Sequence, residues 1–163
     1  MLSQPARLGR VLIIAGSDSG GGAGVQADIK TVTMLGGYAA SAITAITVQN
    51  TLGISFIHPV PAEVVKSQAM AVLDDIGVDA IKTGMLGDQA TVEATAEVID
   101  RAVGVPAVID PVMAAKGGAA LLDLKALDVF VRLLIPRAAL LTPNAPEAEA
   151  LTGIRVSDLG EQR

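Results

Sequence analysis

The sequence of 163 residues predicts a single α/β domain built on a mostly parallel central sheet. Short apolar runs alternate about five times with segments of helical periodicity, which is the pattern of β-α units. The connections between the runs are too long for hairpins, so we expect parallel strands joined by right-handed crossovers. No linker, repeat or low-complexity segment interrupts this pattern, and the length suits one domain over residues 1–163.

The first third of the chain predicts two strands and a helix. Residues 11–15 form a continuous apolar run, typical of a strand that is buried on both faces. A glycine-rich segment over residues 16–24 follows, and apolar spacing then predicts a helix over residues 25–35. Residues 41–48 are rich in β-branched side chains and predict the second strand. The short run over residues 54–59 fits either an edge strand or a loop.

The rest of the chain continues the same alternation. Further strands are expected over residues 79–83, 106–109 and 138–141. Further helices are expected over residues 61–76, 89–103 (capped by Asp88), 123–134 and 147–151.

The composition excludes several classes of protein. Hydrophobic residues make up 51% of the chain and charged residues 18%, which excludes a disordered tail. The net charge is −5 and no cluster of Lys or Arg occurs, so no nucleic-acid partner is expected. Cysteine is absent and His58 is the single histidine, which excludes thiolate and histidine-rich metal sites. No apolar run is long enough for a membrane span or a signal peptide, so we expect a cytoplasmic protein.

Polar or glycine-rich segments follow each of the five main predicted strands. Ligands of an open parallel sheet bind beyond the carboxyl ends of its strands, so these segments are expected to share one ligand-binding edge. They are GSDSGGGAG, QNT, GML, DPVMAAKGG and TPNAPE.

The glycine-rich segment matches no nucleotide-binding fingerprint fully. Residues 22–27 fit G-x-G-x-x-A, but the acidic residue expected about 20 positions later is missing between Lys30 and Glu63. Lys30 also stands too far along for the phosphate-binding pattern G-x-x-x-x-G-K-[ST]. Five glycines in nine residues favour a close approach of the backbone to a ligand over a flexible turn.

Four other side chains are predicted at this edge, and two of them have both a structural and a functional interpretation. Asp28 fits either a solvated helix carboxylate or a ligand contact near a helix N-terminus. Gln49 fits either a surface turn or an amide that binds the edge of a heteroaromatic ring. Asp110 is held extended by the following proline, and Met85 is the one methionine that falls at the edge.

Asn144 and Glu147 stand three residues apart at a predicted helix start. This spacing fits a capping box, in which each side chain bonds the backbone of the other residue. The alternative is that Asn144, Glu147 and Asp110 together orient a hydrated Mg²⁺ ion, which needs few carboxylates.

These motifs resemble the hydroxymethylpyrimidine/phosphomethylpyrimidine kinases, the thiamine-pathway family of the ribokinase-like superfamily. The resemblance covers the chain from about Leu8 to its end. The matching segments occur in the family's order and are Ala15–Asp28, Ile43–Gly53, Lys82–Asp88, Asp110–Gly118 and Leu140–Gly153.

The resemblance implies a three-layer α/β/α fold and ATP-dependent phosphorylation of a hydroxymethylpyrimidine and then of its monophosphate. It also implies that Gln49 and Asp28 bond the ring nitrogens and amino group, while Met85 and Val112 pack against the ring. Asp110, Asn144 and Glu147 would face Mg²⁺ and the ATP phosphates. The full set of residues implied to surround the pyrimidine is Gly16, Ala23, Asp28, Gln49, Met85 and Val112.

Family members continue into a further ATP-binding segment with a catalytic Cys or Asp, which would lie beyond Arg163. We therefore expect a truncated chain that holds the substrate site but no catalytic base. Two alternatives stay open: a related pyridoxal or pyridoxine kinase, and a non-catalytic pyrimidine-binding protein. The resemblance and the apolar excess also favour a homodimer.

Overall fold

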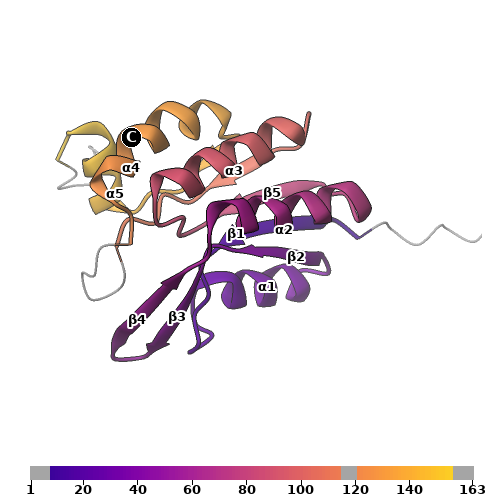
Figure 1. Cartoon of the computed structure of the whole chain (residues 1–163), viewed down its shortest axis with the longest axis horizontal. Helices are drawn as coiled ribbons and strands as arrows, with labels where there is room; N and C mark the ends of the chain where they lie inside the picture. Colours follow the sequence, from indigo (N-terminus) through magenta and orange to yellow (C-terminus); the bar gives the residue numbers. More distant parts are fainter. Residues whose placement is uncertain (1–7, 115–120, 156–163) are drawn as a thin grey trace, which may run out of the picture.

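The computed structural model describes residues 8–114 and 121–155, which form a five-stranded parallel sheet with helices on both faces (Figure 1). The sheet has the strand order β2-β1-β5-β6-β7, and every neighbouring pair in it is parallel. Its strands are β1 (Arg10–Ala15), β2 (Tyr38–Ile43), β5 (Ala80–Thr83), β6 (Ala107–Ile109) and β7 (Leu140–Leu141). The parallel α/β class expected from the sequence is confirmed.

The helices divide into two layers. One layer is α1, which packs against β1 and β2, and the other contains α2, α3 and α4 (Figure 1). The helices are α1 (Gly24–Met34), α2 (Ala62–Asp75), α3 (Gln89–Arg101), α4 (Leu124–Leu133) and α5 (Ala145–Thr152), with a 3₁₀ turn at Ile135–Arg137. This arrangement agrees with the three layers that the resemblance implies.

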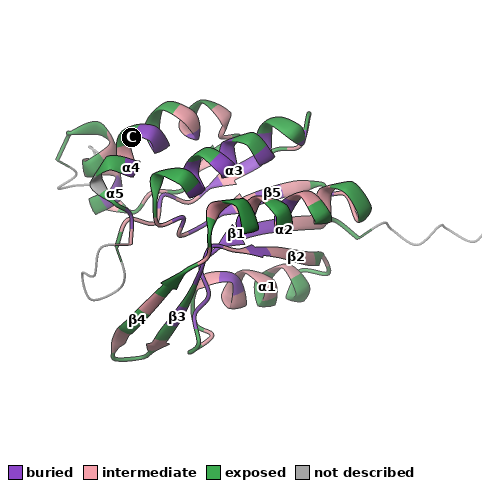
Figure 2. Cartoon of the chain, in the orientation of Figure 1, coloured by how far each residue is buried: buried purple, intermediate pink, exposed green. Residues whose placement is uncertain are grey.

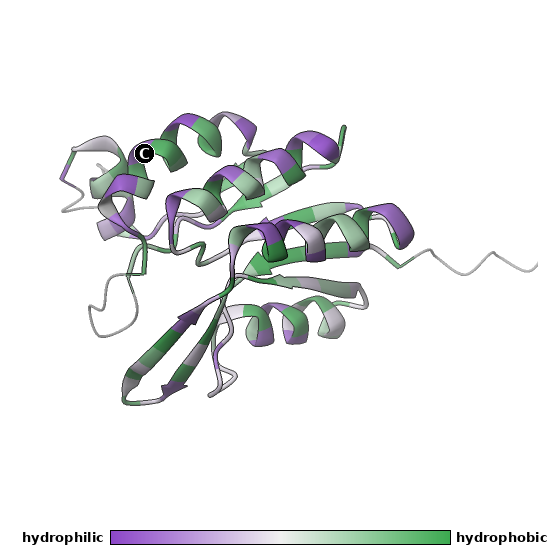
Figure 3. Ribbon diagram, in the orientation of Figure 1, coloured by the Kyte–Doolittle hydropathy of each residue, from purple (hydrophilic) through white to green (hydrophobic). Residues whose placement is uncertain are grey.

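The alternation of side chains along β1 explains both layers. Leu12 and Ile14 are fully buried in the larger core, which lies under α2, α3 and α4. Ile13 lies in the smaller core together with Val25 of α1. Phe130 of α4 is also buried, and purple residues concentrate in the strands and the inner sides of the helices in Figure 2. Figure 3 shows the same central strands as largely hydrophobic, so burial of apolar surface holds the layers together.

The predicted second strand, residues 41–48, is wrong as a single strand. The chain leaves the parallel sheet at Thr44 and forms β3 (Ala45–Asn50) and β4 (Gly53–Pro59), an antiparallel hairpin that extends away from the sheet (Figure 1). The Thr44 amide donates to the Ala15 carbonyl, and its hydroxyl donates to the Met85 carbonyl. These tertiary bonds fix the break, and no Gly or Pro marks it in the sequence.

The run over residues 54–59 is therefore a strand, and the expectation that no connection forms a hairpin is also wrong. A two-residue loop joins β3 to β4, and the amide of Leu52 donates to the side chain of Asn50 there. The remaining predicted helices and strands are confirmed to within a few residues at their ends.

Some sequence expectations fall outside the described residues. Residues 115–118 of the Asp110–Gly118 segment are among them, as are the first seven residues of the chain. Among the residues that the structure does describe, no helix has the length and apolar character to span a membrane.

Candidate functional site

A cavity of about 320 Å³ opens at the carboxyl ends of the parallel strands. The glycine-rich segment, the β3–β4 hairpin and the segments after β5 and β6 all contribute to its walls. The segments predicted to meet at one edge therefore do so, with the exception of TPNAPE, whose residues are not among those that line this cavity. All six residues predicted to contact a substrate line it: Gly16, Ala23, Asp28, Gln49, Met85 and Val112.

Asp18 organises the glycine-rich wall. Its buried carboxylate accepts the backbone N–H groups of Gly20 at 2.8 Å, Gly22 at 3.0 Å and Ala23 at 2.8 Å. These N–H groups are therefore satisfied within the chain and do not point at a ligand phosphate.

Gly24 is a position at which no side chain fits. Its φ is +57°, and a Cβ atom there would lie 2.5 Å from the carbonyl oxygen of Gly16. The Val25 amide donates to that same carbonyl at 3.0 Å. The start of α1 is thus pressed against the end of β1, which closes one side of the cavity.

Three hydroxyl groups, from Ser17, Ser19 and Thr47, connect the hairpin to the glycine-rich segment. The Ser17 hydroxyl accepts the Thr47 amide at 3.1 Å, and the Thr47 hydroxyl donates to the Ser17 carbonyl at 2.8 Å. The Ser19 hydroxyl donates to the Gln49 carbonyl at 2.6 Å and accepts the Gln49 amide at 2.8 Å. The backbone of Gln49 is thereby fixed on both of its polar groups.

Gln49 reaches the cavity by a different route from the one predicted. The sequence suggests that it follows a strand of the main sheet, whereas it lies within β3, above the sheet edge. Side chains alternate along β3, so Gln49 faces the same side as Thr47, and the register shift beside Gln49 leaves Ser55 of β4 as the extra residue. Val48 is exposed on the outer face, while Gln49 is half-buried and lines the cavity beside Thr47.

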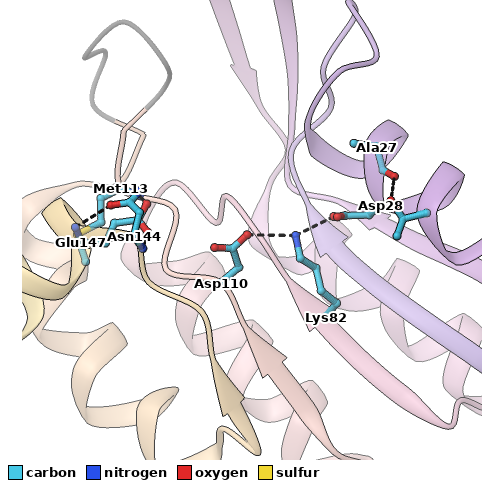
Figure 4. A network of polar contacts seen from close by, with 8 residues as sticks. Ala27, Asp28, Lys82, Asp110, Met113, Asn144 and Glu147 are labelled. Carbon is cyan, nitrogen blue, oxygen red and sulfur yellow. Dashed lines mark hydrogen bonds and ion pairs between the residues drawn. The ribbon is translucent and has the colours of Figure 1, made fainter. Parts of the chain in front are cut away.

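Lys82 lies between the two carboxylates at the cavity floor (Figure 4). Its Nζ atom is 2.9 Å from Oδ2 of Asp28 and 3.3 Å from Oδ2 of Asp110. The three side chains are between 22% and 29% exposed, so the group is shielded from solvent on most sides but open to the cavity. Asp28 is therefore not a freely solvated helix carboxylate.

The apolar wall contains Met85 and Val112. A Cβ atom at Gly16 would lie 3.0 Å from Cε of Met85, so the absent side chain of Gly16 makes room for the thioether. Because thioethers are polarisable and adapt to ring edges, this wall suits a flat heteroaromatic ligand.

Asn144 and Glu147 form the capping box of α5. The side chain of Asn144 accepts the Glu147 amide at 2.9 Å, and the side chain of Glu147 accepts the Asn144 amide at 2.9 Å. Oε1 of Glu147 lies 3.5 Å from the Met113 amide, and Figure 4 shows this cluster apart from Asp110 and Lys82.

The predicted magnesium ligands do not assemble into a site of their own. Asp110 pairs with Lys82, and both carboxylate oxygens of Glu147 face backbone amides. Within residues 8–114 and 121–155, no three His, Cys, Asp or Glu side chains are arranged to hold a metal ion. The arrangement does not fit a preformed Mg²⁺ site, so an ion would have to take most of its ligands from a nucleotide and water.

The sequence analysis missed the roles of Asp18, Lys82 and Thr47. The signal for Lys82 is a lone charge in a short apolar strand, where it is expected to need a partner. Asp18 stands two residues before three consecutive glycines, and its short side chain is suited to accept amides of the residues that follow it. Thr47 gives no such signal, because its partner is 30 residues away.

The fold and the cavity define an α/β protein with a small cavity, lined by polar and apolar side chains, at the carboxyl edge of a parallel sheet. The family model described as phosphomethylpyrimidine kinase matches residues 18–163, and the chain belongs to this family. It is 49% identical over 154 residues to the hydroxymethylpyrimidine/phosphomethylpyrimidine kinase of Bacillus subtilis, covering 94% of this chain and 57% of that relative. The chain thus spans just over half the length of that curated relative.

Two solved structures resemble the chain closely. The phosphomethylpyrimidine kinase of Clostridium difficile superposes with a TM-score of 0.87 at 41% identity, over 94% of this chain and 67% of that one. The pyridoxal kinase of Staphylococcus aureus superposes with a TM-score of 0.86 at 36% identity, over 96% of this chain and 57% of that one. That pyridoxal kinase has been solved with pyridoxal and with AMP-PCP.

Proposed function

We propose that the chain supplies the pyrimidine-binding part of an ATP-dependent kinase of thiamine biosynthesis. Its substrates would be 4-amino-5-hydroxymethyl-2-methylpyrimidine and then the monophosphate of that alcohol. The observation that carries the proposal is that the six residues implied by the family resemblance, from four distant segments, converge on one cavity. Residues 1–163 would act as one domain in this role.

The side chains around the cavity complement an aminopyrimidine. The amide of Gln49 both donates and accepts hydrogen bonds, and the carboxylate of Asp28 accepts them, which suits ring nitrogens and an exocyclic amino group. Met85 and Val112 would pack against the ring. The Ser19 hydroxyl holds the Gln49 backbone in advance, and the Thr47 hydroxyl lies 3.4 Å from Oε1 of Gln49, so binding costs little further ordering.

The transfer step would rest on positioning and charge neutralisation. ATP would be the phosphate donor and would bring Mg²⁺ with its phosphates, and we propose that Asp110, Asn144 and Glu147 face this side. The group that deprotonates the hydroxyl would come from the part of the longer relatives that this chain does not span. No step of the reaction is therefore assigned to a base within these residues.

Substitution of Gln49 tests the proposal. Gln49→Ala should weaken pyrimidine binding by about 1–3 kcal/mol, the usual cost of an unmatched buried polar group. Isothermal titration calorimetry with the pyrimidine alcohol gives this value, and Gln89→Ala on the exposed side of α3 is the matched control. Unchanged affinity in the Gln49 variant would remove that residue from the site.

A pyridoxal kinase is the second candidate, because the Staphylococcus aureus structure superposes nearly as well. Pyridoxal is also a six-membered heteroaromatic ring with a hydroxymethyl group. Parallel titrations with the pyrimidine and pyridoxal separate the two activities. A non-catalytic binding protein would bind a ring compound and release no ADP even as part of a full-length chain.

We also infer that two copies associate through the outer face of the hairpin. Ile46, Val48 and Phe56 are 45%, 54% and 58% exposed there, and Figure 2 shows much of the hairpin as exposed. Val48 and Phe56 are cross-strand partners, so they form one apolar patch. Sedimentation equilibrium should give a dimer mass, and Val48→Lys should shift it to the monomer.

A further inference from the structure

Lys82 is the only cationic side chain among the described residues that line the cavity. The same lining contains three carboxylates, which belong to Asp18, Asp28 and Asp110. Asp18 is satisfied by backbone amides of the glycine-rich segment. Lys82 therefore neutralises one of the two carboxylates that face the interior beside it, and the cavity keeps a net negative charge.

The position of Lys82 on β5 and the absence of a side chain at Gly84 place the ammonium group of Lys82 at this point. β5 is a central strand, and on it Ile81 and Thr83 are buried while Lys82 faces the cavity side. A Cβ atom at Gly84 would lie 2.9 Å from Cβ of Ala15 and 3.4 Å from Nζ of Lys82. The bare backbone of Gly84 thus leaves the space in which Lys82 bridges α1 and the end of β6 (Figure 4).

The bridge also sets the distance between the two carboxylates. Each has an oxygen within hydrogen-bond reach of the same nitrogen, so these oxygens lie no more than about 6 Å apart. Without the ammonium group, two like charges would face each other in a partly buried space. The side chains would then be expected to separate or to recruit another cation.

We propose that Lys82 is a specificity-determining positioning residue that allows the cavity to bind the phosphorylated ring as well as the free alcohol. This inference rests on the proposed function, in which the same site handles both compounds. The free alcohol is neutral, whereas its phosphate ester is a dianion above about pH 7. A cavity lined by three carboxylates repels the ester more strongly than the alcohol, and Lys82 offsets that difference.

The test compares the affinities of the two ligands. Both dissociation constants are measured by calorimetry on the chain without nucleotide, at pH 8 and fixed ionic strength. Lys82→Met should weaken binding of the ester about ten-fold more than binding of the alcohol, because a positive charge near the dianion is lost. Lys82→Arg keeps the charge and should restore the wild-type ratio of the two affinities.

Charge-compensating variants separate this role from a structural one. Lys82→Met combined with Asp110→Asn has the wild-type net charge in the cavity and should return the ratio toward that of the wild type. Asp110→Asn alone should shift the ratio in favour of the ester, and this variant is informative even if Lys82→Met does not fold. A structural role would instead lower both affinities equally, in step with the thermal midpoint.

Two results would overturn the inference. Equal losses for both ligands in Lys82→Met, or no shift of the ratio in Asp110→Asn, would show that Lys82 does not discriminate between them. If the wild-type chain binds neither compound, the proposed function fails and this inference fails with it. If the wild type binds both compounds and the variants keep its ratio of affinities, the role of Lys82 is refuted while the proposed function stands.

Discussion

Replacement of Asp18 by Asn should destabilise the protein by about 2–4 kcal/mol. The carboxylate is 5% exposed, with one oxygen accepting the Gly20 amide and the other accepting the amides of Gly22 and Ala23. An amide side chain has one acceptor oxygen, and its NH₂ group would face at least one backbone donor. In the variant, the backbone amides therefore lose their charged acceptor, and at least one buried N–H group has no acceptor at all.

Urea denaturation followed by circular dichroism measures this change in the free energy of unfolding. A thermal melt should show a fall of roughly 6–12 °C in the midpoint for a chain of this size. Asp88→Asn is the matched control, because Asp88 is exposed and accepts one amide, from Thr91, as the cap of α3. Asn caps helices about as well as Asp, so the control should change stability by only a few tenths of a kcal/mol. The account of the glycine-rich segment is refuted if the two variants lose the same small amount.

Three further changes probe other parts of the fold. Gly24→Ala should cost about 2–4 kcal/mol and abolish ligand binding, because its φ is +57° and its Cβ would strike a carbonyl oxygen. Gly22→Ala should be tolerated, because Gly22 has no positive φ and its Cβ would only touch Oδ2 of Asp18 at 3.9 Å. Comparable urea midpoints for the two variants would contradict this. Thr83→Val should leave stability unchanged or raise it by up to about 1 kcal/mol, since the buried Thr83 hydroxyl has no hydrogen-bond partner among the residues that the structure describes. A clear loss of stability in thermal melts would contradict this. The hydrogen bonds from Arg137 lower the pKa of the Asp100 carboxyl below its ordinary value. This pair should therefore stabilise the wild type relative to Asp100→Asn above about pH 4, and the advantage should vanish as the pH falls through the lowered pKa. A difference in stability between the two proteins that does not change with pH would exclude the pair as its source.

The sequence predicts the parallel sheet because its signals are local. The run over residues 11–15 is apolar enough to be buried on both faces, and Asp88 and Asn144 cap helices through bonds to residues three positions later. The hairpin is different. Its boundary at Thr44 depends on bonds to Ala15 and to a carbonyl 41 residues away, and a continuous β-branched run conceals it.

The same distinction applies to the candidate site. Six of the residues that line the cavity were predicted through motifs that resemble a known family, and the parallel sheet explains why those motifs meet. The bridge from Lys82 to Asp28 spans 54 positions, and neither residue type nor spacing points to that partner. Which carboxylate the partly buried Lys82 meets is decided by packing in three dimensions.

The most direct test of the account is a crystal structure of the chain with 4-amino-5-hydroxymethyl-2-methylpyrimidine. We predict that the ring lies in the 320 Å³ cavity between Met85 and Val112, within hydrogen-bond distance of the side chains of Gln49 and Asp28. A ring bound elsewhere on the protein, or held in the cavity without either polar contact, would contradict the assignment of this site.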